Sequence, residues 1–123
     1  MSALHDYLEL HLAQLGMRGR LDEELGTHHG LAWSDYVLLA VLERAEGALA
    51  TGELARWLGL TGSALVRQLL PLEKTGVLER ERDARGARRV LLRPNGARLL
   101  REARETAEWV CASGAPLRAP AVR

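Results

Sequence analysis

Several features that mark other protein classes are scarce in this sequence of 123 residues. Its single cysteine, Cys111, excludes a framework of internal disulfides and fits a reducing cytoplasm. The longest apolar run, Tyr36 to Leu42, has seven residues, whereas a membrane-spanning helix needs ~20. The first residues lack a cationic segment followed by an apolar stretch, so no secretory signal is predicted. We therefore expect a cytoplasmic protein with no membrane partner.

Motifs that carry out chemistry are also missing. The sequence has no glycine-rich phosphate loop, no nucleophile elbow, and no histidine and aspartate paired with a serine that they would activate. Most acidic residues alternate with basic ones, as on a solvated surface. We therefore expect that the protein is not an enzyme and that it uses no cofactor.

The net charge of +1 is small, but the basic residues are distributed unevenly. Eleven of the 17 lysine and arginine residues lie between Arg67 and Arg104. Such asymmetry indicates that one half of the chain faces a polyanion while the other half serves another purpose. The length and the absence of an internal repeat predict a single domain.

Helical periodicity predicts four helices before residue 76. The first, about 2–25, carries one apolar face, with a kink near Met17 and a loop at 26–30. The second is predicted to start with Ser34 as a cap. Its inward face is formed by five residues (Trp33, Tyr36, Val37, Ala40, Val41). The third, about 51–58, is stopped by Gly59. The fourth is capped by Thr61 and places three leucines on one face (Leu65, Leu69, Leu72).

After Gly76 the pattern changes to two short extended segments and a last helix. Residues 77–82 and 88–92 flank a turn whose tip is near Gly86, which predicts a β-hairpin. Pro94 suits the first turn of a helix over 94–113, with five residues along one side (Leu99, Leu100, Ala103, Ala107, Val110). The tail 114–123 has two prolines and no periodicity, so we expect it to be disordered.

The third and fourth helices have the spacing of a helix-turn-helix. Two helices joined steeply by a short turn need a small residue where they touch, a glycine at positive φ, and apolar residues that lock them to a third helix. Ala55, Gly59, Leu60 and Leu65 meet these demands. The arginine-rich hairpin that follows is typical of a winged helix, whose ribbon reaches the groove beside the one that the recognition helix enters. The alternative is a solvated, salt-bridged hairpin without a ligand.

The stretch from Leu31 to Leu100 resembles the MarR family of bacterial regulators. The resemblance rests mainly on Asp83-x-Arg85-x-x-Arg88, which matches the family's wing signature. Shorter matches flank it on both sides (Glu53-Leu54-Ala55, Gly59-Leu60-Thr61, Leu72-Glu73, Gly76-Val77-Leu78-Glu79-Arg80, Leu92, Asn95-Gly96). The family implies a homodimer, a palindromic operator on double-stranded DNA, and often release by a small-molecule effector, by oxidation or by a metal.

The predicted fold is therefore mainly α with a small β-hairpin wing: a winged helix-turn-helix that dimerises through its N- and C-terminal helices. We expect one winged-helix domain over 1–113, with dimerisation helices at 1–30 and 94–113 and a DNA-binding core at 31–92. The dimer surface is predicted to use residues of the first and last helices (Leu4, Leu8, Leu12, Leu15, Leu100, Ala103, Ala107, Val110).

The sequence also departs from the family pattern. Pro71 predicts that the recognition helix kinks or ends early. Gln68 takes a position that is usually apolar, and Gly62 and Val66 replace polar residues that commonly contact DNA. The last helix ends near Ser113, which leaves no room for the further C-terminal helix that normally completes the dimer.

Seven residues are candidate DNA contacts, namely Thr61, Ser63, Arg67, Gln68, Arg82, Arg85 and Arg88. Thr61 and Ser63 are short donors near a helix N-terminus and suit phosphate. Arg67, one turn on, suits a guanine edge or a phosphate, and Arg85 suits the minor groove. Asp83 is expected to orient an arginine of the wing, Arg88 by the family pattern. The alternative is that Thr61 is only a cap and Arg67 only a surface charge.

Sensor chemistry has weaker support. Glu24 and His28 are four apart, but a loop is predicted there and no second ligand cluster follows, so no metal site is predicted. Cys111 has no cationic neighbour and is expected to be buried and inert rather than an oxidant sensor.

Three aromatic residues, Trp33, Tyr36 and Trp57, are expected to pack in the core. The alternative is that they line a pocket for an aromatic effector between the first and second helices.

The leading interpretation is a sequence-specific transcriptional regulator, a repressor of the MarR type. The alternative from another class is a winged-helix adaptor or anti-regulator that has lost DNA binding, which Gly62, Val66 and Pro71 favour.

Overall fold

A computed structural model describes residues 2–114, whose contacts divide them between two units. Unit 1 contains residues up to Trp33 together with those from Arg104 onward, and unit 2 contains Ser34–Ala103. Except for its first residue, the tail predicted at 114–123 lies outside the described residues. None of the helices in the described part combines the length and the apolar character that a membrane span demands.

Unit 1 is built on helix α1 (Ala3–His29), which is continuous. Ser2 caps its start by accepting the N–H of His5 at 3.0 Å. Its end is Gly30, which adopts φ 63° and donates its N–H to the carbonyl of Gly26. The left-handed conformation that stops a helix therefore occurs at Gly30 and not earlier, because glycine within a helix costs only ~1 kcal/mol. The predicted kink near Met17 and the predicted loop at 26–30 were both wrong.

The two helices of unit 1 share a small core and a polar contact. Nε2 of His29 in α1 lies 2.7 Å from Oγ1 of Thr106 in α5 (Pro94–Ser113). Leu21, Leu25 and Val110 are buried. By contrast, apolar side chains elsewhere on α1 are exposed (Leu4, Tyr7, Leu8, Leu10, Leu15).

The side chains of α5 that were predicted to form a dimer surface are already buried within one chain (Leu100, Ala103, Ala107, Val110). That part of the prediction was wrong, because the inward stripe of α5 packs against its own chain. Leu99 is half-buried, and Trp109 is 57% exposed.

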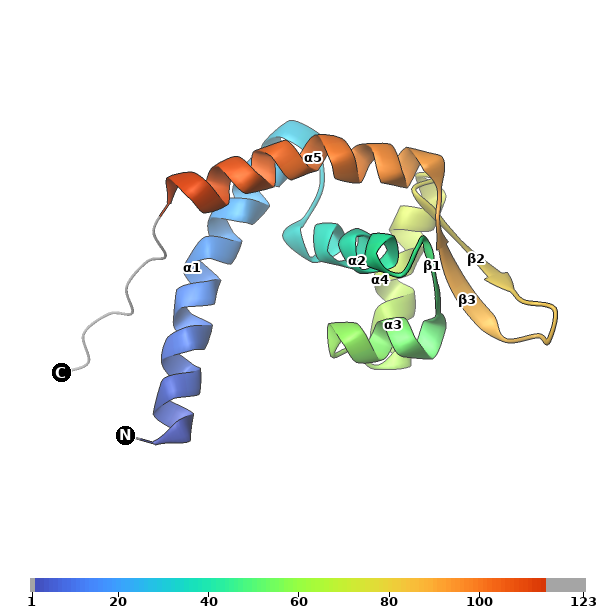
Figure 1. The fold of residues 1–123 in the computed structure, drawn as a ribbon, viewed down its shortest axis with the longest axis horizontal. Coiled ribbons are helices and arrows are strands. Elements are labelled where there is room, and N and C mark those ends of the chain that lie inside the picture. The colour runs from blue at the N-terminus through green and yellow to red at the C-terminus, as the bar shows by residue number, and fades with distance from the viewer. Residues whose placement is uncertain (1, 115–123) are drawn as a thin grey trace. The chain divides into compact units, whose positions relative to one another are not determined.

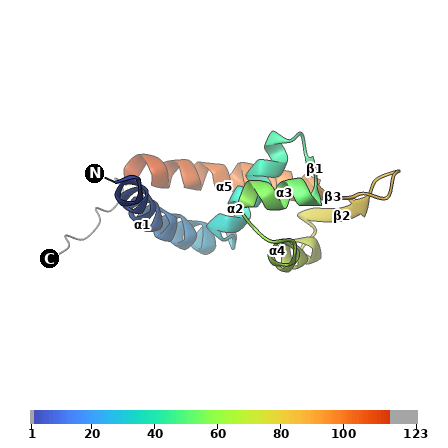
Figure 2. The same ribbon diagram turned by 90° about the horizontal axis from the view of Figure 1, so that it is seen from below.

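Unit 2 contains α2 (Trp33–Arg44) from Ser34 onward, α3 (Thr51–Leu58), α4 (Gly62–Lys74) and the first part of α5. Figure 2 views α4 end-on while α3 lies across the page, so these two helices meet at a steep angle. Leucines from each helix form the core (Leu38, Leu39, Leu42, Leu54, Leu65, Leu69, Leu72, Leu100). This arrangement confirms the predicted helix-turn-helix.

The inward face of α2 differs from the prediction. Leu38, Leu39 and Leu42 are fully buried, whereas the five residues predicted to face inward are only half-buried. Most residues of α2 are apolar, so periodicity alone does not define a single stripe. Ser34 is not the cap either, because the helix begins at Trp33, whose N–H donates to Oδ1 of Asp22 at 2.7 Å.

A three-stranded antiparallel sheet completes unit 2, as Figure 1 shows. β2 (Leu78–Arg82) and β3 (Arg88–Leu92) form the predicted hairpin, with Arg82 opposite Arg88 nearest the tip. β1 (Ala48–Ala50) pairs with the other edge of β3, so the strand order is β1-β3-β2. The sequence did not predict β1, because three residues are too few to show an alternating pattern.

The start of α5 packs tightly beside the sheet. A Cβ added at Gly96 would collide with the carbonyl oxygen of Val77 and lie 2.8 Å from Cδ1 of Leu92. The same carbonyl accepts the N–H of Arg93 at 3.0 Å. The absence of a side chain at Gly96 therefore allows α5 to begin directly against the base of the hairpin.

Candidate nucleic-acid interface

The turn between α3 and α4 is shaped by one glycine and one threonine. Gly59 ends α3 at φ 66°, and the N–H of Leu60 donates to the carbonyl of Ala55 at 2.9 Å. Oγ1 of Thr61 then caps α4 by accepting the N–H of Ala64 at 3.1 Å. The first turn of α4 contains no acidic residue, so its partly positive N-terminus is not neutralised by its own side chains. The predicted cap and turn are confirmed.

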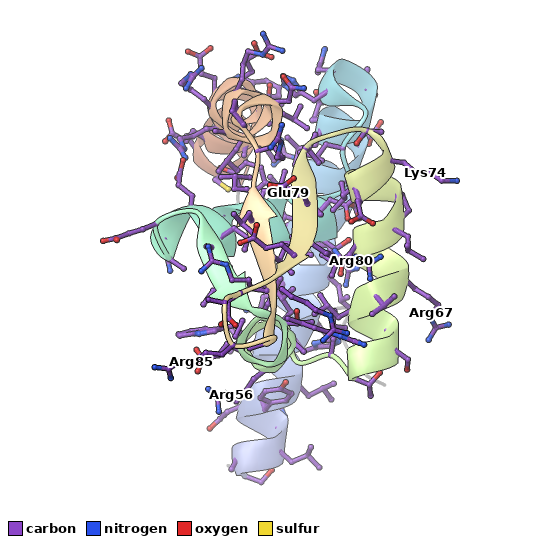
Figure 3. All side chains as sticks on the ribbon, turned by 90° about the vertical axis from the view of Figure 1, so that its right-hand side faces the viewer. Arg56, Arg67, Lys74, Glu79, Arg80 and Arg85 are labelled. Atoms are coloured by element: carbon purple, nitrogen blue, oxygen red, sulfur yellow. The ribbon has the colours of Figure 1, made fainter. Side chains whose placement is uncertain are left out.

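The face of α4 opposite its buried leucines carries four exposed side chains in a stripe (Ser63, Arg67, Leu70, Lys74). Figure 3 shows Arg67 and Lys74 projecting from the same side of the helix. Arg67 forms no ion pair with any residue between 2 and 114. The helix passes through Pro71 to Lys74, so of the two predicted outcomes, a kink or an early end, the early end was wrong. A proline in the last turn removes only one N–H from the hydrogen-bond ladder.

Gln68 is turned toward α2 instead of outward. Its Nε2 donates to the carbonyl of Ser34 and to Oδ1 of Asp35, both at 3.1 Å. These bonds hold the middle of α4 to the start of α2. These two bonds explain why a polar residue occupies this half-buried position, and no DNA contact is needed for that explanation.

The hairpin of β2 and β3, here called the wing, has a tip closed by Asp83. Oδ1 of Asp83 accepts the N–H of Arg85 at 2.8 Å and that of Ala87 at 2.9 Å. Gly86 takes φ 82°, and its carbonyl accepts Nη1 of Arg82 at 3.1 Å. Asp83 therefore orders the backbone of the tip. Within the described residues Asp83 contacts no arginine side chain, so the expectation that it orients one stays a prediction.

Arginines of the wing differ in whether an acid neutralises them. Toward its base, Nε of Arg89 lies 2.9 Å from Oε1 of Glu81, and directly after β3 Nη1 of Arg93 lies 3.3 Å from Oε1 of Glu79. At the tip, Arg85 is exposed and has no ion-pair partner within the described chain (Figure 3), and the same holds for Arg88 where β3 begins. The uncompensated positive charge of the wing is therefore concentrated near its tip.

Glu73 and Arg80 join α4 to β2, a contact that the sequence did not predict. Nη2 of Arg80 lies 3.1 Å from Oε1 of Glu73, and the backbone N–H of Arg80 donates to Oε2 at 3.3 Å. These hydrogen bonds from Arg80 hold the pKa of the Glu73 carboxyl below its ordinary value. In the sequence, the only indication of this contact was the pair of opposite charges, Glu73 and Arg80, on either side of the turn at Gly76.

A groove of about 410 Å³ lies between α4 and the wing. It is lined by one residue of α3, two of α4 and four of the wing (Thr51, Val66, Glu73, Arg80, Glu81, Arg82, Arg88). The candidate residues Arg82 and Arg88 therefore share a groove with Val66 of the candidate recognition helix. Arg67 and Arg85 lie outside its lining.

The groove beside Trp33 is not lined by all three aromatic residues. Trp33 lines a groove of about 340 Å³ within unit 1 (with His11, Gln14, Leu15, Met17, Arg18 and Leu21). Neither Tyr36 nor Trp57 is part of that lining. Trp57 is 70% exposed on α3, so the expectation that it packs in the core was wrong. Short helix α3 buries only the side that carries Leu54 and Ala55, and Trp57 lies outside that side.

The structure also differs from the prediction at the residues considered as sensors. Because α1 is continuous, Glu24 and His28 face each other with 3.3 Å between Oε2 and Nε2. Between residues 2 and 114, no group of three or more metal-binding side chains is gathered in one place. Cys111 is exposed, not buried as expected, because the inward stripe of α5 runs through the neighbouring Val110.

Comparison with known proteins supports one family. A model described as the MarR family matches residues 29–89. No curated protein sequence matches the chain significantly. Among solved structures, the transcriptional regulator BldR from Sulfolobus solfataricus has a TM-score of 0.77 and 24% identity, with 92% of this chain and 84% of that one covered.

Two further structures were solved with DNA. Sco3205, a MarR family transcriptional regulator from Streptomyces coelicolor in complex with DNA, has a TM-score of 0.76 and 26% identity over 92% of this chain and 74% of its own. A mutant of MarR from E. coli, complexed with operator DNA, has a TM-score of 0.75 and 20% identity over 85% and 75%. The family and these neighbours are transcriptional regulators and not enzymes. The chain belongs to the MarR family and has the winged helix-turn-helix fold of its transcriptional regulators.

Proposed function

We propose that this protein is a sequence-specific DNA-binding transcriptional regulator. Two features that unit 2 combines carry the proposal. The first turn of α4 has no acidic residue, and the arginines at the tip of the wing lack acidic partners in the described chain. A protein that binds a duplex needs cations free to contact phosphates and a helix end that fits the major groove. The DNA complexes of Sco3205 and of E. coli MarR support the proposal by their similarity in fold.

Each candidate residue has a role in this proposal. Thr61 and Ser63 hold a phosphate at the N-terminus of α4, and Arg67 contacts a guanine edge or a phosphate. Arg85 enters the minor groove from the tip of the wing, which Asp83 keeps folded. Arg82 and Arg88 contact the backbone from the groove between wing and helix. Gln68 has no proposed DNA contact, because α2 engages its amide.

The proposal includes a homodimer on a palindromic operator, acting as a repressor in the cytoplasm. The exposed apolar side chains of α1 support association with a second copy, since such groups are stabilised by leaving water. Two recognition helices would then address half-sites about one helical turn apart. Release by a small-molecule effector is supported by the groove beside Trp33, whose lining is partly apolar.

Fluorescence anisotropy with a labelled duplex from upstream of the protein's own gene tests the proposal. We expect binding that weakens steeply with salt, because bound phosphates release counterions. Arg67→Ala and Arg85→Ala should each cost about 1–3 kcal/mol if they contact base edges. Arg101→Ala is the matched control, since Arg101 is an exposed arginine on α5 and its loss also removes one charge. It should change affinity much less.

If Arg67→Ala and Arg85→Ala both bind like the unmodified protein, the assignment of the interface is wrong. If no duplex is bound at low salt by the unmodified protein, the winged-helix adaptor becomes the better explanation. The small or apolar residues Gly62 and Val66 on α4 are the observation that favours it.

A further inference from the structure

The part of α4 that would approach bases is poor in hydrogen-bonding side chains. Val66 is half-buried and lines the groove beside the wing, one turn after Gly62. A Cβ at Gly62 would meet nothing within 4 Å, so packing does not require glycine there. In the first two turns, Arg67 is the one long donor on the outward face (Figure 3). Apart from the short hydroxyl of Ser63, the N-terminal half of the helix therefore presents open space, one branched apolar side chain and one guanidinium.

Base edges in the major groove differ in whether they suit an apolar side chain. Adenine, guanine and cytosine present polar atoms there, whereas thymine adds a C5-methyl group beside its O4. Placing valine against a polar edge would remove water from that edge without replacing its hydrogen bond, which is unfavourable. Placing valine against the thymine methyl buries two apolar surfaces together. The base that fits opposite Val66 is therefore thymine.

We propose that Val66 is a specificity-determining residue that recognises the C5-methyl group of a thymine in each operator half-site. The inference rests on the proposed function and deepens it, because it names the chemistry of the sequence that is bound. Gly62 leaves room for the base edge to approach the helix end, and Arg67, the next residue after Val66, has no ion-pair partner in the described chain and can contact a guanine or a phosphate. Each half-site then combines one thymine methyl contact with a hydrogen-bonded contact beside it.

Deoxyuridine tests this directly, because it differs from thymidine only by the missing methyl group. Operator duplexes are first selected from a random-sequence library with the full chain, and each thymine of the preferred duplex is then replaced singly by deoxyuridine. The unmodified protein should lose about fourfold in affinity at one thymine per half-site, the effect of one buried methyl group. This arm uses the unmodified protein, so it does not depend on whether a variant folds.

The second arm asks whether Val66 is the residue responsible. Val66→Ala should weaken binding to the thymine duplex by a similar factor and abolish the penalty for deoxyuridine. Leu70→Ala is the control, because Leu70 is an exposed apolar residue one turn further along the same helix, 44% exposed. It should leave the deoxyuridine penalty unchanged.

The two possible failures are distinguishable. If a duplex is selected and bound but no deoxyuridine changes the affinity, or if Val66→Ala keeps the full penalty, the inference is overturned while the proposed function stands. If the library yields no bound duplex at low salt, the proposed function fails and the inference fails with it.

Discussion

Gly96 offers a sharp test of how α5 is attached to the sheet. In Gly96→Ala the new methyl group would overlap the backbone carbonyl of Val77, which cannot rotate away as a flexible side chain would. The helix start must therefore shift away from the hairpin. Such a shift strains the hydrogen bond from Arg93 to the same carbonyl and disturbs the contact with Leu92.

Two opposing effects set the magnitude. Alanine is favoured over glycine in a helix by ~1 kcal/mol. Overpacking typically costs about 1–3 kcal/mol, and a collision with backbone belongs at the upper end of that range. The expected net result is a loss of about 2 kcal/mol in the free energy of unfolding. The sign is decided by the collision, not by helix propensity.

Urea denaturation followed by circular dichroism measures this loss, at one fixed protein concentration because association contributes to stability. Gly52→Ala is the matched control. Gly52 also lies in the first turn of a helix in unit 2, but a Cβ there would meet nothing within 4 Å. The control should be as stable as the unmodified protein or slightly more so. If Gly96→Ala unfolds at the same urea concentration as the control, the close approach of α5 to the sheet is not what fixes glycine at this position.

Two further predictions concern the wing. Because Arg80 lowers the pKa of Glu73, the carboxylate contributes stability above its ordinary pKa of 4.5, and this contribution disappears as the pH falls through the lower folded value. Glu73→Gln should therefore be less stable than the unmodified protein near neutral pH and approach it in acid; urea unfolding across pH checks this, and a difference that grows in acid would contradict it. Asp83→Ala removes the acceptor for two N–H groups and should speed the amide exchange of Arg85 and Ala87 measured by NMR, whereas Asp83→Asn keeps an acceptor and should do so less. Equal exchange in all three proteins would show that Asp83 does not hold the tip.

The sequence predicted best those elements whose ends are marked by local chemistry. Helix α3 stops at Gly59 and α5 starts at Pro94 as predicted, because positive φ and a fixed proline ring act within one or two residues. The hairpin also followed from its own turn at Gly86. For α1, the pattern misplaced the stop signal, because a glycine that ends a helix and one that lies inside it look alike in sequence.

Burial was harder to predict than secondary structure. Trp57 and Cys111 were expected inside and lie outside, since exposure depends on which face of a helix the rest of the fold covers. The candidate interface was predicted as a set of arginines, but the sequence did not reveal which of them acids neutralise. Arg89 and Arg85 are both arginines of the wing, and only cross-strand register distinguishes the one that is paired within the described chain from the one that is not.

The central position of β3 has a mechanical consequence. Its register joins it to β2 along the whole hairpin and to β1 at residues 89–91, so the base of the wing is held from two sides. At Arg88, β3 pairs with β2 alone, and between Arg88 and Arg82 the tip is held only by the Asp83 turn. We therefore expect bending to concentrate in the tip, residues 82–88, because residues 89–91 are paired on both edges. In the proposed DNA complex, the tip can adjust to the width of the minor groove while pairing with β1 and β2 holds the base of the wing.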